Sequence, residues 1–170
     1  MWRSLRHRNY RLYLSGQLVS LCGTWMQQIA QSWLVFRLTG AATILGVVTF
    51  ASQIPIFALA PLAGVITDRW SRFRLTLITQ TISLILALLL AGLTLVGHIE
   101  VWHIIVLGFA QGVVLAFDMP ARQSLVNELV EIGDLPNAIA LNSSMVNAAR
   151  ILGPAIAGLV VATVEREFAF

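Results

Sequence analysis

Apolar stretches of about 20 residues recur along almost the whole of this chain, and a helix needs about that length to cross a bilayer. In lipid each stretch must be helical, because an unpaired backbone amide there costs several kcal/mol. The sequence therefore predicts an all-α membrane protein. We expect five transmembrane helices, at residues 12–36, 43–66, 75–96, 101–117 and 137–164.

Composition supports this prediction. The 170-residue chain is 58% hydrophobic and only 11% charged, whereas about a quarter of the residues of a soluble domain are charged. The basic start, MWRSLRHRNYR, resembles part of a signal peptide, but no small-x-small cleavage site follows it. We therefore interpret residues 12–36 as an uncleaved first span. All eleven basic residues are arginines, and all but Arg150 lie outside the predicted spans, so we expect no nucleic-acid partner.

Arginine placement also predicts orientation. Four arginines precede the first span, three lie in the second gap (67–74) and one in the fourth gap (118–136), whereas the alternate gaps hold only Arg37. By the positive-inside rule the N-terminus and the second and fourth gaps are predicted to be cytoplasmic. Because the fourth gap is long and polar, we expect a short amphipathic helix there along the membrane surface.

A polar stripe marks the first span. Its members recur every three or four residues, so they share one face of a helix: Gln17, Ser20, Thr24, Gln27 and Gln31. This face avoids lipid and either forms hydrogen bonds with other helices or lines a water-filled path. In the second case Gln27 and Gln31 are candidates for a substrate path.

The fifth span carries a second stripe, formed by Ser143, Asn147 and Arg150. A central arginine costs roughly 2.5 to 3.5 kcal/mol on insertion scales, so Arg150 needs a carboxylate, a carbonyl or a substrate as its partner. The alternative is that its side chain reaches the membrane surface. Asp118, Arg122 and Arg150 are the candidate charge partners, with a predicted Asp118–Arg150 pair, and Asn147 and Arg150 are further candidates for the substrate path.

Small residues in two spans predict close helix packing. Gly108 and Gly112 have the spacing that lets two helix backbones approach, and Gly153, Pro154 and Gly158 place small residues and one helix-kinking proline in the fifth span.

The sequence gives little support for an enzyme. No Ser/His/Asp constellation, phosphate loop or paired intramembrane carboxylate is present, and Cys22 is the single cysteine. We expect no catalytic residues, no metal and no cofactor. His7, His98 and His103 lie near loops or the N-terminus, and we expect them to be solvated.

The stretch GVITDRWSRFR (64–74), which includes the second gap, resembles the signature of the major facilitator superfamily, Gly-x-Leu-Ala-Asp-Arg-x-Gly-Arg-Lys. Gly64, Asp68, Arg69 and Arg72 match it, whereas Ser71 and Phe73 replace its glycine and lysine. The glycine replacement puts the usual tight-turn geometry in question. The resemblance implies a cytoplasmic latch between the two halves of a transporter, which stabilises the outward-facing state through Asp68.

A second stretch, Gly153-Pro154-x-x-Ala157-Gly158, resembles the fifth-helix motif of exporters in this superfamily. The stretches AFDMPARQSLVNELV and DLPNAIALNSS are similar to the subgroup of the enterobactin exporter and transmembrane secretion effectors. The resemblance implies a secondary transporter of the bacterial inner membrane, specifically a proton-coupled exporter of siderophores or drug-like molecules.

Transporters of this kind have about twelve spans in two halves, with the substrate between them. The resemblance therefore implies that residues 1–170 form a partial N-terminal transmembrane domain, truncated before its sixth helix. Its expected partners are the lipid bilayer, the missing C-terminal half and, in the complete transporter, a small-molecule substrate. The alternative is a membrane scaffold or interaction protein that transports nothing.

Overall fold

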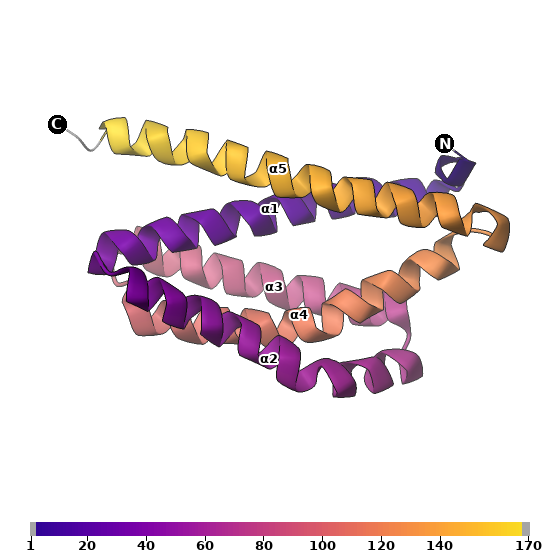
Figure 1. Ribbon diagram of the computed structural model, residues 1–170, viewed down its shortest axis with the longest axis horizontal. Helices are drawn as coiled ribbons and strands as arrows, with labels where there is room; N and C mark the ends of the chain where they lie inside the picture. Colours follow the sequence, from indigo (N-terminus) through magenta and orange to yellow (C-terminus); the bar gives the residue numbers. More distant parts are fainter. Residues whose placement is uncertain (1–2, 168–170) are drawn as a thin grey trace. The chain divides into compact units, whose positions relative to one another are not determined.

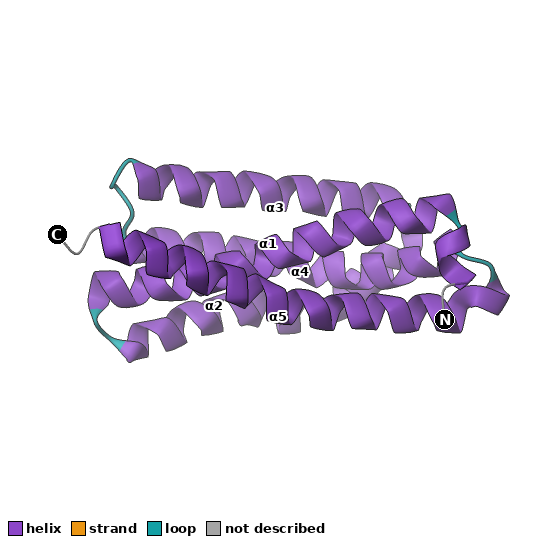
Figure 2. Cartoon of the chain, turned by 90° about the horizontal axis from the view of Figure 1, so that it is seen from above, coloured by secondary structure: helices purple, strands orange, loops and turns teal. Residues whose placement is uncertain are grey.

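The computed structural model describes residues 3–167, and within them it contains helices and no strands (Figure 1). The predicted all-α class is confirmed. Short loops join the helices (Figure 2). The elements are η1 Arg3–Arg6, α1 Arg8–Thr39, α2 Ala42–Arg69, α3 Arg72–Leu95, α4 Val101–Leu129, η2 Ile132–Asp134 and α5 Leu135–Glu167.

Within the described residues, four helices are long and apolar enough to cross a membrane: α2, α3, α4 and α5. The first helix, α1, is also long but less hydrophobic than these four. Its glutamine stripe and the arginines at both of its ends lower its hydropathy. The chain is thus a membrane protein with five long helices, of which composition identifies four as spans.

The fourth gap was predicted wrongly. Residues 118–136 contain no separate surface helix, because α4 continues past Phe117 and through Pro120 to Leu129. Two features explain the continuation. Asp118 and Arg122 form an ion pair one helical turn apart, which reduces the cost of their charges, and membrane helices tolerate proline where neighbouring groups compensate for the lost hydrogen bond.

Glycine makes two of the turns possible. Gly40 between α1 and α2 has φ +62° and Gly97 between α3 and α4 has φ +75°, a left-handed conformation that is costly for other residues. Both turns lie in gaps between the predicted spans, at residues 37–42 and 97–100. Most helices begin or end a few residues outside the predicted spans, because hydropathy marks the apolar part of a helix and the helix extends beyond it.

The helices fall into two compact units. Unit 1 comprises residues 1–33 and 126–170, which include most of α1 and all of α5, and unit 2 comprises residues 34–125, which include α2, α3 and most of α4. The core of unit 2 contains Val35, Val48, Leu90 and Ile104. The core of unit 1 contains Tyr10, Val126 and Ala138.

In unit 1 the segment before α1 is fastened to the start of α5. We call this the N-terminal clasp, formed by Ser4, His7 and Tyr10 on one side and Asp134, Asn137 and Ala138 on the other. The Ser4 hydroxyl lies 2.8 Å from Asn137 Oδ1, and the buried Tyr10 hydroxyl donates to the Ala138 carbonyl at 2.9 Å.

The expectation that His7 is solvated was wrong. Its Nε2 lies 3.2 Å from Asp134 Oδ2, and the two side chains are only 27% and 21% exposed. The 3-10 turn of residues 132–134 brings this carboxylate to the N-terminal segment.

Candidate functional site

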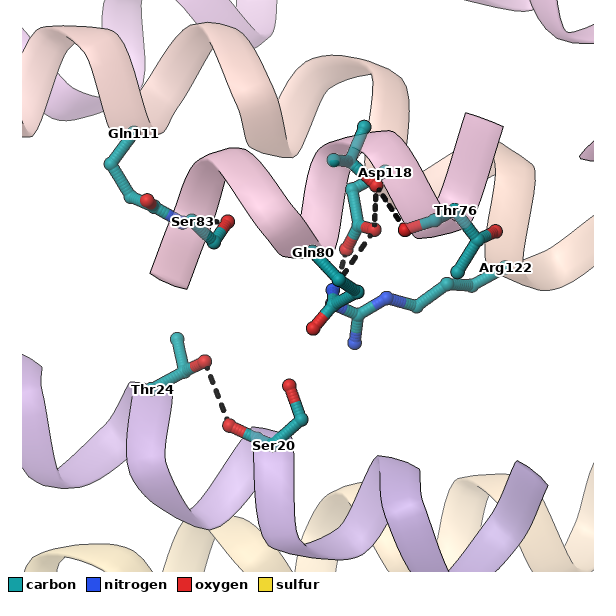
Figure 3. Close-up of polar contacts among 9 residues, drawn as sticks. Ser20, Thr24, Thr76, Gln80, Ser83, Gln111, Asp118 and Arg122 are labelled. Atoms are coloured by element: carbon teal, nitrogen blue, oxygen red, sulfur yellow. Dashed lines mark hydrogen bonds and ion pairs between the residues drawn. The ribbon is translucent and has the colours of Figure 1, made fainter. Parts of the chain in front are cut away.

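Asp118 is a carboxylate buried among apolar helices. It lies inside α4 and its residue is only 2% exposed. Oδ2 forms an ion pair with the Arg122 guanidinium. Oδ1 accepts hydrogen bonds from Thr79 Oγ1 at 2.6 Å and from Gln80 Nε2 at 3.2 Å, both on α3 (Figure 3). Both carboxylate oxygens are therefore satisfied, which an ion in apolar surroundings requires.

The contacts continue along the two helices. The Gln111 amide on α4 donates to the Ser83 hydroxyl on α3 at 3.0 Å (Figure 3). We call the whole set the polar seam. It consists of Thr76, Thr79, Gln80 and Ser83 on α3, and Gln111, Asp118 and Arg122 on α4.

On its other side α4 packs against α2 at backbone distance. A Cβ at Gly108 would lie 2.7 Å from the Ser52 hydroxyl, and one at Gly112 would overlap the Ser52 carbonyl oxygen. Side chains at either position would push the two helices apart. The close approach predicted from the spacing of these glycines is confirmed.

Gly64 lies beside a small cavity in unit 2. The cavity has a volume of about 220 Å³ and is lined by Ile56, Ala60, Gly64, Ala116, Met119, Pro120 and Gln123. Met119 and Pro120 follow Asp118 directly on α4. The cavity beside the first glycine of the signature motif is thus lined by the two residues that follow the buried carboxylate.

The motif loop itself is a two-residue turn. Asp68 and Arg69 are exposed at the end of α2, and Arg72 begins α3. Ser71, which stands where the motif has glycine, has φ −61°, and its carbonyl accepts a hydrogen bond from the Leu75 amide at 2.9 Å. The turn needs no left-handed residue, so Ser71 preserves its tight geometry.

In unit 1, α5 contacts α1 through Gly153. A Cβ there would lie 2.5 Å from Trp25 Cβ and 3.0 Å from the Cys22 carbonyl oxygen, so only glycine allows this approach. At Gly158, by contrast, an added Cβ would have nothing within 4 Å. Pro154 is half-buried inside α5.

Arg150 lies on the same side of α5. Its guanidinium carbon is 5.1 Å from the centre of the Trp25 ring, which is the geometry of a cation–π contact. The side chain is otherwise exposed. Asp118 and Arg150 belong to different units, and their pairing stays a prediction.

The predicted substrate-path residues lie on α1 and α5. Gln27 and Gln31 are both half-buried, whereas Asn147 is exposed and donates to the Ser143 carbonyl at 3.0 Å. In the same α1 stripe the Thr24 hydroxyl donates to the Ser20 carbonyl at 3.0 Å (Figure 3). In the described part of the chain, no three His, Cys, Asp or Glu side chains are placed to hold a metal ion.

Thr79 and Gln80 are the site residues that sequence reasoning missed. Their signal was present, because Arg72, Thr76, Thr79, Gln80 and Ser83 share one helical face by spacing. Threonine and serine are common in membrane helices, where they often bond to the carbonyl four residues earlier, as Thr81 does to Leu77. The stripe became informative only when α4 placed Asp118 against it.

Comparison with known proteins identifies relatives over nearly the whole chain. The staphyloferrin A transporter of Staphylococcus aureus is 30% identical over 161 residues, which cover 94% of this chain and 41% of that protein. The multidrug efflux pump Tap of Mycolicibacterium fortuitum is 27% identical, with 89% and 38% covered. The macrolide efflux protein A of Streptococcus pyogenes is 26% identical, with 94% and 40% covered.

The chain thus spans about two fifths of the length of these curated relatives. No solved structure matches it significantly. The model of the transmembrane secretion effector family matches residues 1–170. The chain therefore belongs to the transmembrane secretion effector family of the major facilitator superfamily.

Proposed function

We propose that this chain forms five membrane-spanning helices of the N-terminal half of a proton-coupled exporter of small molecules. Asp118 is the observation that carries the proposal, because a membrane scaffold has no need of a buried carboxylate satisfied by three side chains. Intramembrane ions are expensive and mark ion or substrate pathways. The relatives named for a siderophore, a macrolide and multidrug efflux support a substrate of siderophore or drug-like class.

The test is efflux by the complete transporter that contains this chain. Cells that produce it should accumulate less of a fluorescent drug than cells with an empty vector, and a protonophore should abolish the difference. Efflux that persists after the proton gradient collapses would contradict proton coupling. Efflux absent for a broad substrate panel, at normal membrane abundance, would favour the scaffold alternative.

For membrane topology we propose an N-terminus in the cytoplasm of a bacterium, with α1 as the first span of an inner-membrane protein. The arginines before α1 and around the turn at Trp70 support this orientation. An alkaline phosphatase fused after Trp70 should be inactive, and a fluorescent protein at the same point should be bright. The reverse pattern would contradict the orientation.

The motif loop is proposed to act as the cytoplasmic latch toward the C-terminal half. Asp68 and Arg69 are exposed at the end of α2, where a partner helix can reach them. Asp68→Asn should lower efflux and leave membrane abundance unchanged, because it removes one charge from an exposed turn. Loss of the protein from the membrane would make Asp68 a folding residue instead.

The proposed substrate path runs along Gln27 and Gln31 of α1 and Asn147 and Arg150 of α5. All four carry polar groups on helices of unit 1. Gln31→Ala should change the relative efflux of two substrates more than Ser15→Ala, a matched change on the exposed surface of α1.

A further inference from the structure

The Thr79 hydroxyl lies between two acceptors and can serve only one of them. Its Oγ1 is 2.6 Å from Asp118 Oδ1 and 2.9 Å from the Thr76 carbonyl oxygen. A hydroxyl has one proton to donate and two lone pairs that accept. When the Thr79 hydroxyl proton points to the Thr76 carbonyl, a lone pair of Thr79 Oγ1 faces Asp118. The 2.6 Å contact is then a hydrogen bond only if Asp118 carries a proton of its own.

The same heavy-atom positions therefore suit both protonation states of Asp118. With Asp118 ionised, Thr79 donates to Oδ1, and 2.6 Å is the usual length of a hydroxyl–carboxylate bond. With Asp118 protonated at Oδ1, the acid donates to Thr79 and Thr79 donates to Thr76. The switch needs only rotation about the bond that carries the hydroxyl proton.

Arg122 distinguishes the two states. Its contact with Oδ2 is an ion pair only while the carboxylate is ionised, so protonation of Asp118 at Oδ1 removes the charge attraction and leaves a weaker hydrogen bond. Arg122 is held loosely for a buried cation, since its Nε is buried without a hydrogen-bond partner in the described structure. Its side chain retains 14% exposure, which gives the guanidinium a route toward water.

We propose that Asp118 is the proton-binding group of this chain, and that Thr79 is the positioning residue that holds Oδ1 in both protonation states. A hydronium ion gives its proton to Oδ1 and becomes water, the charge attraction between Asp118 and Arg122 is lost, and the Thr79 hydroxyl turns to the Thr76 carbonyl. Release of the proton to water reverses each change. The inference rests on the proposed proton-coupled transport and assigns a residue to its proton.

Other charged groups lie on the two neighbouring helices, α2 and α3. On α3, Arg72 shares the face of Thr76 and Thr79, about one turn before Thr76 and about two turns before Thr79. On α2, Asp68 and Arg69 are exposed at the end of the helix. Arg122 is thus the cation whose attraction to Asp118 the proton removes.

The test is infrared spectroscopy of this chain in lipid nanodiscs during acidification. The carbonyl band of a protonated carboxylic acid should appear, and Asp118→Asn should remove it. Thr79→Val should move the band in frequency, because it removes the hydroxyl that forms the 2.6 Å hydrogen bond with Asp118 Oδ1. Thr79→Ser should restore the wild-type frequency.

Thr81→Val is the matched control, because the Thr81 hydroxyl donates to the Leu77 carbonyl on the exposed side of the same helix. It should leave the band unchanged. If Thr79→Val does not fold, Thr79→Ala replaces it, with helicity checked by circular dichroism. A band that survives Asp118→Asn, or a band that is the same in wild type and both Thr79 variants, overturns the inference.

The infrared spectrum does not depend on transport, so failure of the proposed function and failure of the assignment of Asp118 and Thr79 can be told apart. Proton-independent efflux would overturn the proposed function even where the Asp118 band titrates as expected. An unaltered spectrum in the variants would overturn the assignment of Asp118 and Thr79 even where efflux is proton-coupled.

Discussion

The N-terminal clasp of unit 1 and the polar seam of unit 2 are both built from side-chain hydrogen bonds, but they lie at different depths along their helices. The clasp joins the segment at the start of α1 to the start of α5. The seam lies inside α3 and α4. Water can replace contacts at a helix end, whereas interior contacts have no such substitute, so a charge in the interior indicates function.

The largest expected effect comes from breaking the seam. Asp118→Ala leaves Arg122 buried without its counter-ion and should cost about 3 to 5 kcal/mol of the free energy of unfolding. The measurement is chemical or thermal unfolding of the chain in detergent. Asp118→Asn keeps hydrogen-bonding groups and should cost less. Equal stability of Asp118→Ala and wild type would show that the ion pair does not form.

A smaller effect is expected where helices meet at glycine. Gly112→Ala in unit 2 and Gly153→Ala in unit 1 place a methyl group against a neighbouring helix, which should cost about 1 to 3 kcal/mol each. Gly92→Ala and Gly158→Ala are matched controls with open space around the new methyl group. These should be neutral or slightly stabilising, because alanine favours helix. Equal losses at all four positions would contradict the close contacts.

The clasp should be weaker than the seam. Tyr10→Phe removes the hydrogen bond to the Ala138 carbonyl and should cost about 0.5 to 1.5 kcal/mol. The rate of amide hydrogen exchange at the start of α5 should increase by the factor that this loss of free energy implies, while the rate in α3 stays the same. Ser15→Ala, which removes an exposed local hydrogen bond on α1, is the control. Equal acceleration in α3 would show that the clasp does not act locally.

The smallest effect is expected at Arg150. Its contact with the Trp25 ring is exposed and should contribute about 0.5 to 1 kcal/mol, part of which Arg150→Lys retains. Unfolding of Arg150→Ala, Asp118→Ala and the double variant tests the ion pair that the sequence predicts. If the losses of unfolding free energy in the two single variants add up to the loss in the double variant, the pair is excluded. A difference larger than about 0.5 kcal/mol between that sum and the double variant would support it.

The sequence predicted the helices, most of the gaps between them and the packing of α4 through Gly108 and Gly112, because each follows from local spacing. It failed at α4 beyond Phe117, since hydropathy counts Asp118 and Arg122 as two charges and cannot register their neutralisation one turn apart. It also missed the clasp. Ser4 and Asn137 are 133 residues apart, and no spacing rule pairs residues across that distance.

The most direct test of the central claim, that Asp118 carries the coupling proton of an exporter, uses the complete transporter in proteoliposomes. An imposed pH gradient should drive substrate transport by the wild type, and Asp118→Asn should lose that response while it binds substrate and reaches the same abundance. Thr79→Ser should transport as the wild type does. Gradient-driven transport that continues unchanged in Asp118→Asn would contradict the claim.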